Sequence, residues 1–175
     1  MADAKEPGRR DALRTLIGAG GAALGCAVVV PGLVFVVGPA RGSGGGGRWV
    51  RTVKLDALRE GEPKRVSIVA DERDAWTLTK DVELGAAWLV RRGDRVFAWS
   101  ATCPHLGCAI RAGDGASAGG FSCPCHASTF AGDGKRGEGP SPRDMDALAT
   151  KVEEGFVVVD FRKYRTGTPE KVEIG

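Results

Sequence analysis

The sequence predicts an all-β head, an antiparallel β-sandwich, attached to an N-terminal transmembrane helix. Three observations support this fold class. Residues 15–37 carry no charged side chain, and short runs rich in Val, Ile, Thr and aromatic residues follow from residue 49 onward. Both histidines and four of the five cysteines lie between positions 103 and 126. A chain of 175 residues is long enough for one domain and an appendage.

The composition excludes several other classes of protein. Glycine accounts for 27 of the 175 residues, but the glycines cluster without a G-X-Y period, which excludes collagen. A hydrophobic content of 42% argues against a disordered chain. The formal net charge of +3 is too small for a strongly basic nucleic-acid-binding protein, so no nucleic acid is expected as a partner.

The uncharged segment 15–37 is long enough to cross a membrane. A helix of this length spans roughly 34 Å, compared with about 30 Å for the hydrocarbon core. Pro31 and several glycines disfavour a helix in water but are tolerated in membrane helices. A buried core helix is the alternative interpretation, which the length of the uncharged run disfavours.

The residues before this segment indicate export across a bacterial cytoplasmic membrane. Arg9 and Arg10, followed by apolar positions and Arg14, resemble the twin-arginine signal, although Ala12 stands where that signal prefers Phe. Ordinary basic flanking of a membrane helix is the alternative, and lysines and arginines are balanced on the two sides of the helix. The orientation therefore depends on the twin-arginine pattern, which places residues 1–14 in the cytoplasm and the head on the periplasmic side.

The end of the apolar run indicates that the anchor stays attached to the head. No A-x-A pattern of small residues follows the run, so we expect an uncleaved, single-pass anchor over residues 15–37. The residues around Cys26 loosely resemble a lipoprotein processing box. Lipidation of Cys26 therefore stays open beside the simpler interpretation of a small apolar residue in a membrane helix.

Residues 38–48 are predicted to form a flexible hinge between the anchor and the head at residues 49–175. Four consecutive glycines at 44–47 give the chain almost no local conformational preference. Such a segment behaves as a random-coil tether. A passive spacer and a hinge that lets the head move are both compatible with this composition, and we favour the hinge.

The head is predicted to be β because short apolar runs recur at intervals of about ten residues. Seven candidate strands lie at 49–55, 65–70, 75–79, 86–92, 95–100, 120–123 and 155–161. Gly, Pro and Asp separate them, and the triplet at 92–94, Arg-Gly-Asp, suits a hairpin turn. Regular short strands of this kind are typical of a small antiparallel sandwich or barrel.

Two short motifs carry the chemistry of the head. They are Cys103-Pro104-His105-Leu106-Gly107-Cys108 and Cys123-Pro124-Cys125-His126-Ala127-Ser128. Structural zinc sites use other spacings, plain disulfides would leave both histidines unexplained, and a thioredoxin-like site needs C-x-x-C. The remaining interpretation is a 2Fe–2S cluster with two thiolates on one iron and two imidazoles on the other.

The two motifs closely resemble C-x-H-x-G-C and C-P-C-H-x-S of the Rieske iron–sulfur proteins, and the layout of anchor, glycine-rich hinge and β head is similar to that family as well. The resemblance implies one 2Fe–2S cluster and a disulfide of the kind found in the membrane electron-transport branch, which is compatible with an oxidising compartment. It implies these roles: Cys103 and Cys123 on the inner iron, His105 and His126 on the outer iron, and Cys108 bonded to Cys125.

Further positions match the family around the cluster. Ser128 matches a serine that donates a hydrogen bond to a bridging sulfide, and Leu106 matches an apolar residue that helps to keep water away. The segment 139–142, Gly-Pro-Ser-Pro, resembles a stiff loop that covers the cluster in quinol-oxidising members, although it also suits an ordinary surface turn. Phe130 stands where the family has a tyrosine hydroxyl donor.

The resemblance also implies a function. It indicates the Rieske subunit of a bacterial cytochrome bc-type quinol:cytochrome c oxidoreductase, within a dimeric complex of several subunits. The head would dock on cytochrome b, take one electron from a quinol and a proton through His105 or His126, and pass the electron to a c-type cytochrome. Two alternatives stay open: the small subunit of a periplasmic molybdenum oxidase such as arsenite oxidase, and a stand-alone anchored Rieske electron carrier. The segment 139–142 and the glycine hinge favour the first function.

Phe130 leads to a testable prediction. Phenylalanine has no hydrogen-bond donor, so we predict a lower reduction potential than in tyrosine-bearing relatives, which favours menaquinol over ubiquinol as the electron donor. We expect Phe130→Tyr to raise the potential measured by protein-film voltammetry against the wild type. An unchanged potential would contradict this interpretation.

Overall fold

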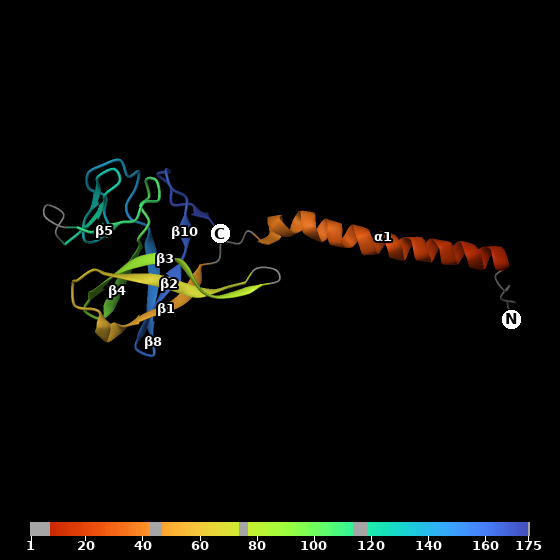
Figure 1. Ribbon diagram of the computed structural model, residues 1–175, viewed down its shortest axis with the longest axis horizontal. Helices are drawn as coiled ribbons and strands as arrows, with labels where there is room; N and C mark the ends of the chain where they lie inside the picture. Colours follow the sequence, from red (N-terminus) through yellow and green to blue (C-terminus); the bar gives the residue numbers. More distant parts are fainter. Residues whose placement is uncertain (1–7, 43–46, 74–76, 114–118, 175) are drawn as a thin grey trace, which may run out of the picture. The chain divides into compact units, whose positions relative to one another are not determined.

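The computed structural model describes residues 8–42, 47–73, 77–113 and 119–174. The chain divides into two compact units, one that ends at Gly44 and one that begins at Gly45. The first unit contains the helix α1 (Arg9–Gly42), and the second is a head built from β-strands (Figure 1). The predicted fold class, a mostly β head with antiparallel sheets and a long apolar N-terminal helix, is confirmed.

The helix α1 has the length and composition of a membrane-spanning helix. Its segment Arg9–Val37 is long and apolar enough to cross a membrane. Apolar side chains surround this segment on all sides and are exposed, as expected for a helix that faces lipid rather than a protein core. The helix continues over residues 38–42, which the sequence assigns to the hinge. Residues 43–46 of that expected hinge lie outside the described residues, so the hinge stays a prediction.

The strands of the head are short, as the sequence predicts. In chain order they are β1 (Arg48–Lys54), β2 (Lys64–Arg73), β3 (Leu78–Arg92), β4 (Arg95–Ser100), β5 (Arg111–Ala112), β6 (Phe121–Cys123), β7 (Ser128–Phe130), β8 (Ala147–Glu153), β9 (Phe156–Phe161), β10 (Lys163–Tyr164) and β11 (Glu173–Ile174). A 3₁₀ turn over Leu55–Ala57 follows β1.

The larger sheet encloses the first of two apolar cores. Its six strands have the order β1-β9-β8-β4-β3-β2 with antiparallel pairing throughout. The first and last strands of this order also contact each other, so the sheet curls around its inner side chains. The most deeply buried members of this first core are Ile68, Ala87, Leu89, Val157 and Val159.

The three-stranded sheet, β5-β6-β7, lies against a second core that is rich in aromatic residues, and β10 and β11 form a separate two-stranded sheet. Strand β3 separates the two cores because its side chains alternate between its two faces. Ala87 and Leu89 belong to the first core, whereas Trp88 and Val90 belong to the second. The strand is therefore buried on both faces, and one buried cysteine of each sequence motif, Cys103 and Cys123, belongs to the second core.

The structure corrects the predicted strands by joining two of them and by adding five that were not predicted, β5, β7, β8, β10 and β11. The strand expected at 75–79 lies partly outside the described residues, and its Leu78 and Thr79 belong with residues 86–92 to one long strand, β3, whose pairing with β2 shifts near Gly85. Strand β8 was not predicted, because its sequence, ALATKVE, has little of the alternation that marks the other strands. The hairpin at residues 92–95 is confirmed, with Gly93 at φ 61° in the turn between β3 and β4.

Candidate metal centre

The first Cys/His loop (103–108) follows β4 and is closed by its own backbone. The N–H of Cys103 donates to the carbonyl of Cys108 at 2.8 Å, and the N–H of Gly107 donates to the carbonyl of Cys103 at 2.9 Å. Gly107 has a φ of 81°, which a glycine adopts without steric cost. The segment C-x-H-x-G-C thus folds into a tight turn that keeps Cys103, His105 and Cys108 close together.

The second Cys/His loop (123–128) joins β6 to β7. Cys123 and Ser128 are paired across the base of this hairpin. Between them, Ala127 has a φ of 55°, a left-handed conformation that is uncommon for a residue with a Cβ atom. This turn reverses the chain directly after His126 and returns it to the sheet at Ser128.

The two buried free thiols of the described residues are Cys103 and Cys123, one from each loop. Burial raises the pKa of the Cys103 thiol to about 11, and the adjacent Cys123 thiol adds to the rise. The backbone N–H groups of His105 and Leu106 act in the opposite direction, because they point at the Cys103 sulfur and favour its charged form. Two soft sulfur ligands therefore meet in a dry site that already contains N–H donors.

The two histidines form the outer side of the site. Their rings meet edge to face with 4.7 Å between ring centroids. His126 is exposed and His105 is half-buried. Leu106, next to them, is 62% exposed, an apolar side chain on the surface beside the imidazoles. The site thus has a buried side with sulfur donors and an open side with imidazole donors.

A disulfide joins the two loops. Cys108 is bonded to Cys125, the pair that the resemblance implies, across a separation of 17 residues. The sulfurs of Cys108, Cys123 and Cys125 lie within 4.8 Å of one another, a cluster that by distance alone could hold a metal ion. Because two of these sulfurs are bonded to each other, only Cys123 of the three has a thiol available to a metal.

The proline loop (139–142) packs on the second Cys/His loop. Its Ser141 is buried, and the backbone N–H of Ser141 donates to the hydroxyl of Ser128 at 3.1 Å. The Ser128 oxygen accepts this bond, so its own proton remains available to a further acceptor. Gly139 has a φ of 94°, and a Cβ atom there would lie 2.5 Å from the Cα of Ser128.

Phe130 lies in the second core, close to the buried side of the site. It is 2% exposed and is paired with Phe121 across the β6–β7 hairpin. Its ring supplies apolar packing and no hydrogen bond to the sulfurs.

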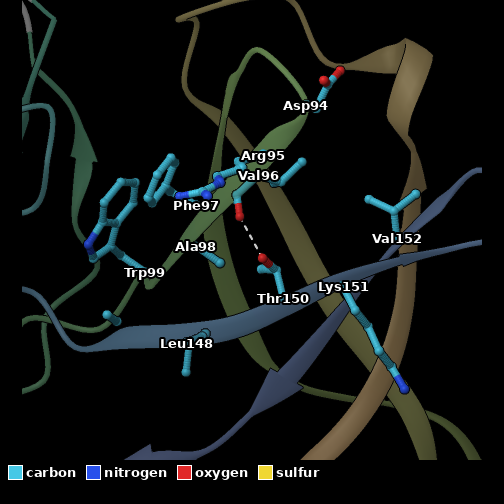
Figure 2. A pocket seen from close by; sticks show the side chains of 11 residues that line it. Asp94, Arg95, Val96, Phe97, Ala98, Trp99, Leu148, Thr150, Lys151 and Val152 are labelled. Carbon is cyan, nitrogen blue, oxygen red and sulfur yellow. Dashed lines mark hydrogen bonds between the residues drawn. The ribbon is translucent and has the colours of Figure 1, made fainter.

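A hollow of about 480 Å³ between β4 and β8 is a separate feature (Figure 2). Its lining combines Phe97, Trp99 and Leu148 with the charged residues Arg95 and Lys151. The hydroxyl of Thr150 donates to the carbonyl of Val96 across it, as Figure 2 shows. The lining includes no cysteine or histidine, so this hollow is separate from the two Cys/His loops.

Comparison with known protein families identifies this arrangement. Residues 48–153 match the model of the Rieske [2Fe-2S] domain, and both Cys/His loops and the proline loop lie within the match. The chain belongs to the Rieske family. Its cofactor is accordingly the Rieske [2Fe-2S] cluster.

Curated relatives extend over most of this Rieske protein. The menaquinol:cytochrome c reductase iron–sulfur subunit of Bacillus subtilis is 32% identical over 145 residues, which cover 82% of this chain and 84% of the relative. The cytochrome b6-f complex iron–sulfur subunit of Gloeobacter violaceus is 28% identical over 155 residues, or 86% and 81% of the two chains. Among solved structures, the plasma-membrane Rieske protein of Synechocystis PCC 6803 is 30% identical with a TM-score of 0.39, over 48% of this chain and 85% of that one.

The side chains present fit a Rieske cluster. Such a cluster needs two thiolates on one iron and two imidazoles on the other. The Rieske head brings together two buried free cysteines and a pair of neighbouring histidines, with N–H donors directed at one sulfur. All six of the cysteine and histidine positions predicted from the sequence lie in the two loops, and Ser128 and Leu106 lie beside them.

Sequence reasoning missed the support behind these loops. Arg143 and Asp146 form a buried ion pair, and the C-terminal segment (165–168) bonds to the first Cys/His loop. An Arg and an Asp three positions apart are common on protein surfaces, so no sequence signal distinguishes this pair. The carbonyls that Arg143 also binds, those of Arg165 and Thr168, lie far away along the chain.

The contact between Gly139 and Ser128 gives a testable prediction. We expect Gly139→Ala to reduce the free energy of unfolding by about 3 kcal/mol, because it adds a backbone clash to a left-handed φ. The matched control is Gly155→Ala, where φ is 77° and the space around the Cβ position is open. That variant carries only the left-handed strain, about 1 kcal/mol. Denaturant titration of the purified proteins measures both, and equal losses would contradict the proposed packing of the proline loop.

The disulfide gives a second prediction. Replacement of both Cys108 and Cys125 by Ser removes a cross-link over a separation of 17 residues. We expect a loss of about 3 kcal/mol in the free energy of unfolding, chiefly because the unfolded chain gains freedom. Reduction of the wild type with a thiol reagent should produce a comparable loss in the same denaturant titration and none in the double variant. Unchanged stability in the double variant would show that the loops are held together without the cross-link.

Proposed function

We propose that this chain is the Rieske iron–sulfur subunit of a bacterial quinol:cytochrome c oxidoreductase of the cytochrome bc type. The observation that carries the proposal is the division of the site into a buried side with two thiols and an open side with two imidazoles. A disulfide joins the two loops that provide these groups. The names of the relatives in Bacillus subtilis and Gloeobacter violaceus support it, since both are iron–sulfur subunits of membrane electron-transport complexes.

The division of the site into a buried and an open side supports an assignment of the ligands. Cys103 and Cys123 would hold the inner iron, and His105 and His126 the outer iron. When bound, the cluster supplies a one-electron redox centre whose potential is raised because neutral imidazoles replace two thiolates.

The imidazoles on the open side of the site would accept the proton of the quinol. His126 is exposed and His105 is half-buried, so the ring nitrogen that does not face the metal can contact a quinol hydroxyl. A hydrogen bond between this nitrogen and the hydroxyl orients the quinol and gives its proton an acceptor. The exposed Leu106 beside the imidazoles supplies an apolar contact for the ring of the quinol or for the surface on which the head docks.

The surrounding loops keep water from the sulfur side. The proline loop covers Ser128, whose free hydroxyl proton can donate to a sulfur of the site. Hydrogen bonds to the sulfurs and exclusion of water both tune the potential of a metal centre. Because Phe130 contributes no such hydrogen bond, we expect a low reduction potential for the cluster. A low potential suits menaquinol as the electron donor. The name of the Bacillus subtilis relative supports this choice.

The proposed assembly follows from the helix and the twin-arginine pattern. The helix α1 anchors the chain in the bacterial cytoplasmic membrane by a single pass, with the head on the periplasmic side. The head docks on cytochrome b to meet the quinol and passes the electron to a c-type cytochrome. The glycine-rich residues 44–47 of the expected hinge would let the head move, since α1 takes up residues 38–42 and β1 begins at Arg48, and the chain would work within a dimeric complex of several subunits.

Removal of one ligand tests the proposal. In Cys103→Ser purified in detergent, we expect the iron content to fall at least about tenfold and the electron paramagnetic resonance (EPR) signal of the reduced cluster to disappear, because a thiolate ligand is lost. In the wild type, a menaquinol analogue should reduce the cluster to its EPR-active form.

The matched control is Cys26→Ser, which removes the exposed free cysteine of the helix. This variant should keep its iron and its signal. Full iron content in Cys103→Ser would contradict the ligand assignment, and a wild-type cluster that the quinol analogue does not reduce would contradict the role in quinol oxidation.

A further inference from the structure

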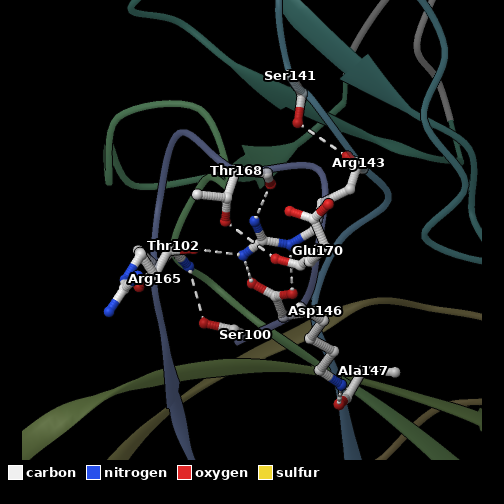
Figure 3. Close-up of polar contacts among 10 residues, drawn as sticks. Ser100, Thr102, Ser141, Arg143, Asp146, Ala147, Arg165, Thr168 and Glu170 are labelled. Carbon is white, nitrogen blue, oxygen red and sulfur yellow. Dashed lines mark hydrogen bonds and ion pairs between the residues drawn. The ribbon is translucent and has the colours of Figure 1, made fainter. Parts of the chain in front are cut away.

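A buried ion pair lies behind the proline loop and outside the proposed ligand set (Figure 3). The side chains of Arg143 and Asp146 are 9% and 6% exposed. The guanidinium donates to both carboxylate oxygens, with Nε to Oδ1 at 2.9 Å and Nη2 to Oδ2 at 2.8 Å. Two parallel bonds fix the plane of the guanidinium as well as its position. Asp146 is tied to the large sheet in turn, because its carbonyl accepts the N–H of Ser100 at 2.8 Å.

The same guanidinium binds the C-terminal segment (165–168). Nη2 donates to the carbonyl of Arg165 at 2.8 Å, and Nη1 donates to the carbonyl of Thr168 at 2.5 Å. Within this segment, the N–H of Gly167 donates to the carbonyl of Pro104 at 2.8 Å. The segment therefore connects Arg143 to the residue that precedes His105.

Arg143 is also connected to the second Cys/His loop. Its carbonyl accepts the hydroxyl of Ser141 at 2.9 Å, and the N–H of Ser141 donates to the hydroxyl of Ser128 at 3.1 Å. The supports of the first and second Cys/His loops thus meet at one residue.

Stability alone is a poor explanation for an arginine at this position. A buried ion pair adds little net stability compared with apolar residues of similar size. The planar guanidinium instead makes four bonds here in set directions, to one carboxylate and two carbonyls. A lysine would keep the charge but lacks this rigid fork. The geometry of the bonds is therefore what arginine provides.

We propose that Arg143 is a positioning residue of the metal centre, which sets the separation of the two Cys/His loops through the C-terminal segment and the proline loop. The inference rests on the proposed function, because it takes these loops as the iron-binding loops. Groups that orient ligands from behind commonly tune a metal site, and a loosened loop would change the hydrogen bonds and the water around the sulfurs.

The test uses Arg143→Lys in the full-length protein with its cluster. Arg162→Lys is the matched control, since Arg162 also pairs with a buried aspartate, Asp160, but its other ion pair is to Glu173. We expect Arg143→Lys to speed hydrogen exchange at the amides of Gly167 and Ser141 at least about tenfold. We also expect it to broaden the EPR signal of the reduced cluster and to shift its potential. The control should leave all three readouts at their wild-type values.

Each outcome decides the proposal. Wild-type exchange and an unchanged spectrum in iron-loaded Arg143→Lys would overturn it, as would the same changes in the control. If Arg143→Lys does not fold, Asp146→Asn decides instead. Because Asp146 fixes the plane of the guanidinium, faster exchange at the Gly167 amide in this variant supports the proposal, and exchange at the wild-type rate overturns it. A wild-type protein without a 2Fe–2S cluster would contradict the proposed function itself.

Discussion

The metal centre depends on the packing of two cysteine thiols into an aromatic core. Cys103 and Cys123 are members of the second core, together with Trp88, Trp99 and Phe121. The Phe121 ring lies 5.5 Å from that of Trp88 and 6.0 Å from that of Trp99, centroid to centroid, in tilted arrangements that aromatic rings favour. Protein interiors are packed as densely as organic crystals, so neighbouring side chains hold each sulfur in place. The packing of the second core therefore positions both sulfurs.

The imidazole side of the centre is exposed, in contrast to the buried sulfur side. His126 and Leu106 gain no packing from the second core and face solvent. An electron carrier needs this asymmetry, because the reacting edge has to contact a partner while the sulfurs stay dry. The proposed contact with a quinol uses the exposed edge, and the proline loop protects the buried one.

Three kinds of bond hold the two Cys/His loops and the segments that pack on them. A covalent bond joins Cys108 to Cys125, a hydrogen bond joins Ser141 to Ser128, and the ion pair of Arg143 supports both loops from behind. These supports differ in sequence distance and in chemistry, so the loss of one leaves the others in place. The predictions for Gly139, the disulfide and Arg143 separate their contributions.

The sequence by itself determined the donor types, their spacing within each loop, the turn at Gly93 and most strands, because these features depend on neighbouring residues. Strand β8 escaped prediction because its pairing with β4 and β9, rather than its own alternation, makes it a strand. Only the tertiary structure brought Cys103 beside Cys123 and placed Arg143 against the carbonyls of Arg165 and Thr168. Those contacts join residues far apart along the chain, and they form only when strand pairing and core packing bring the segments together.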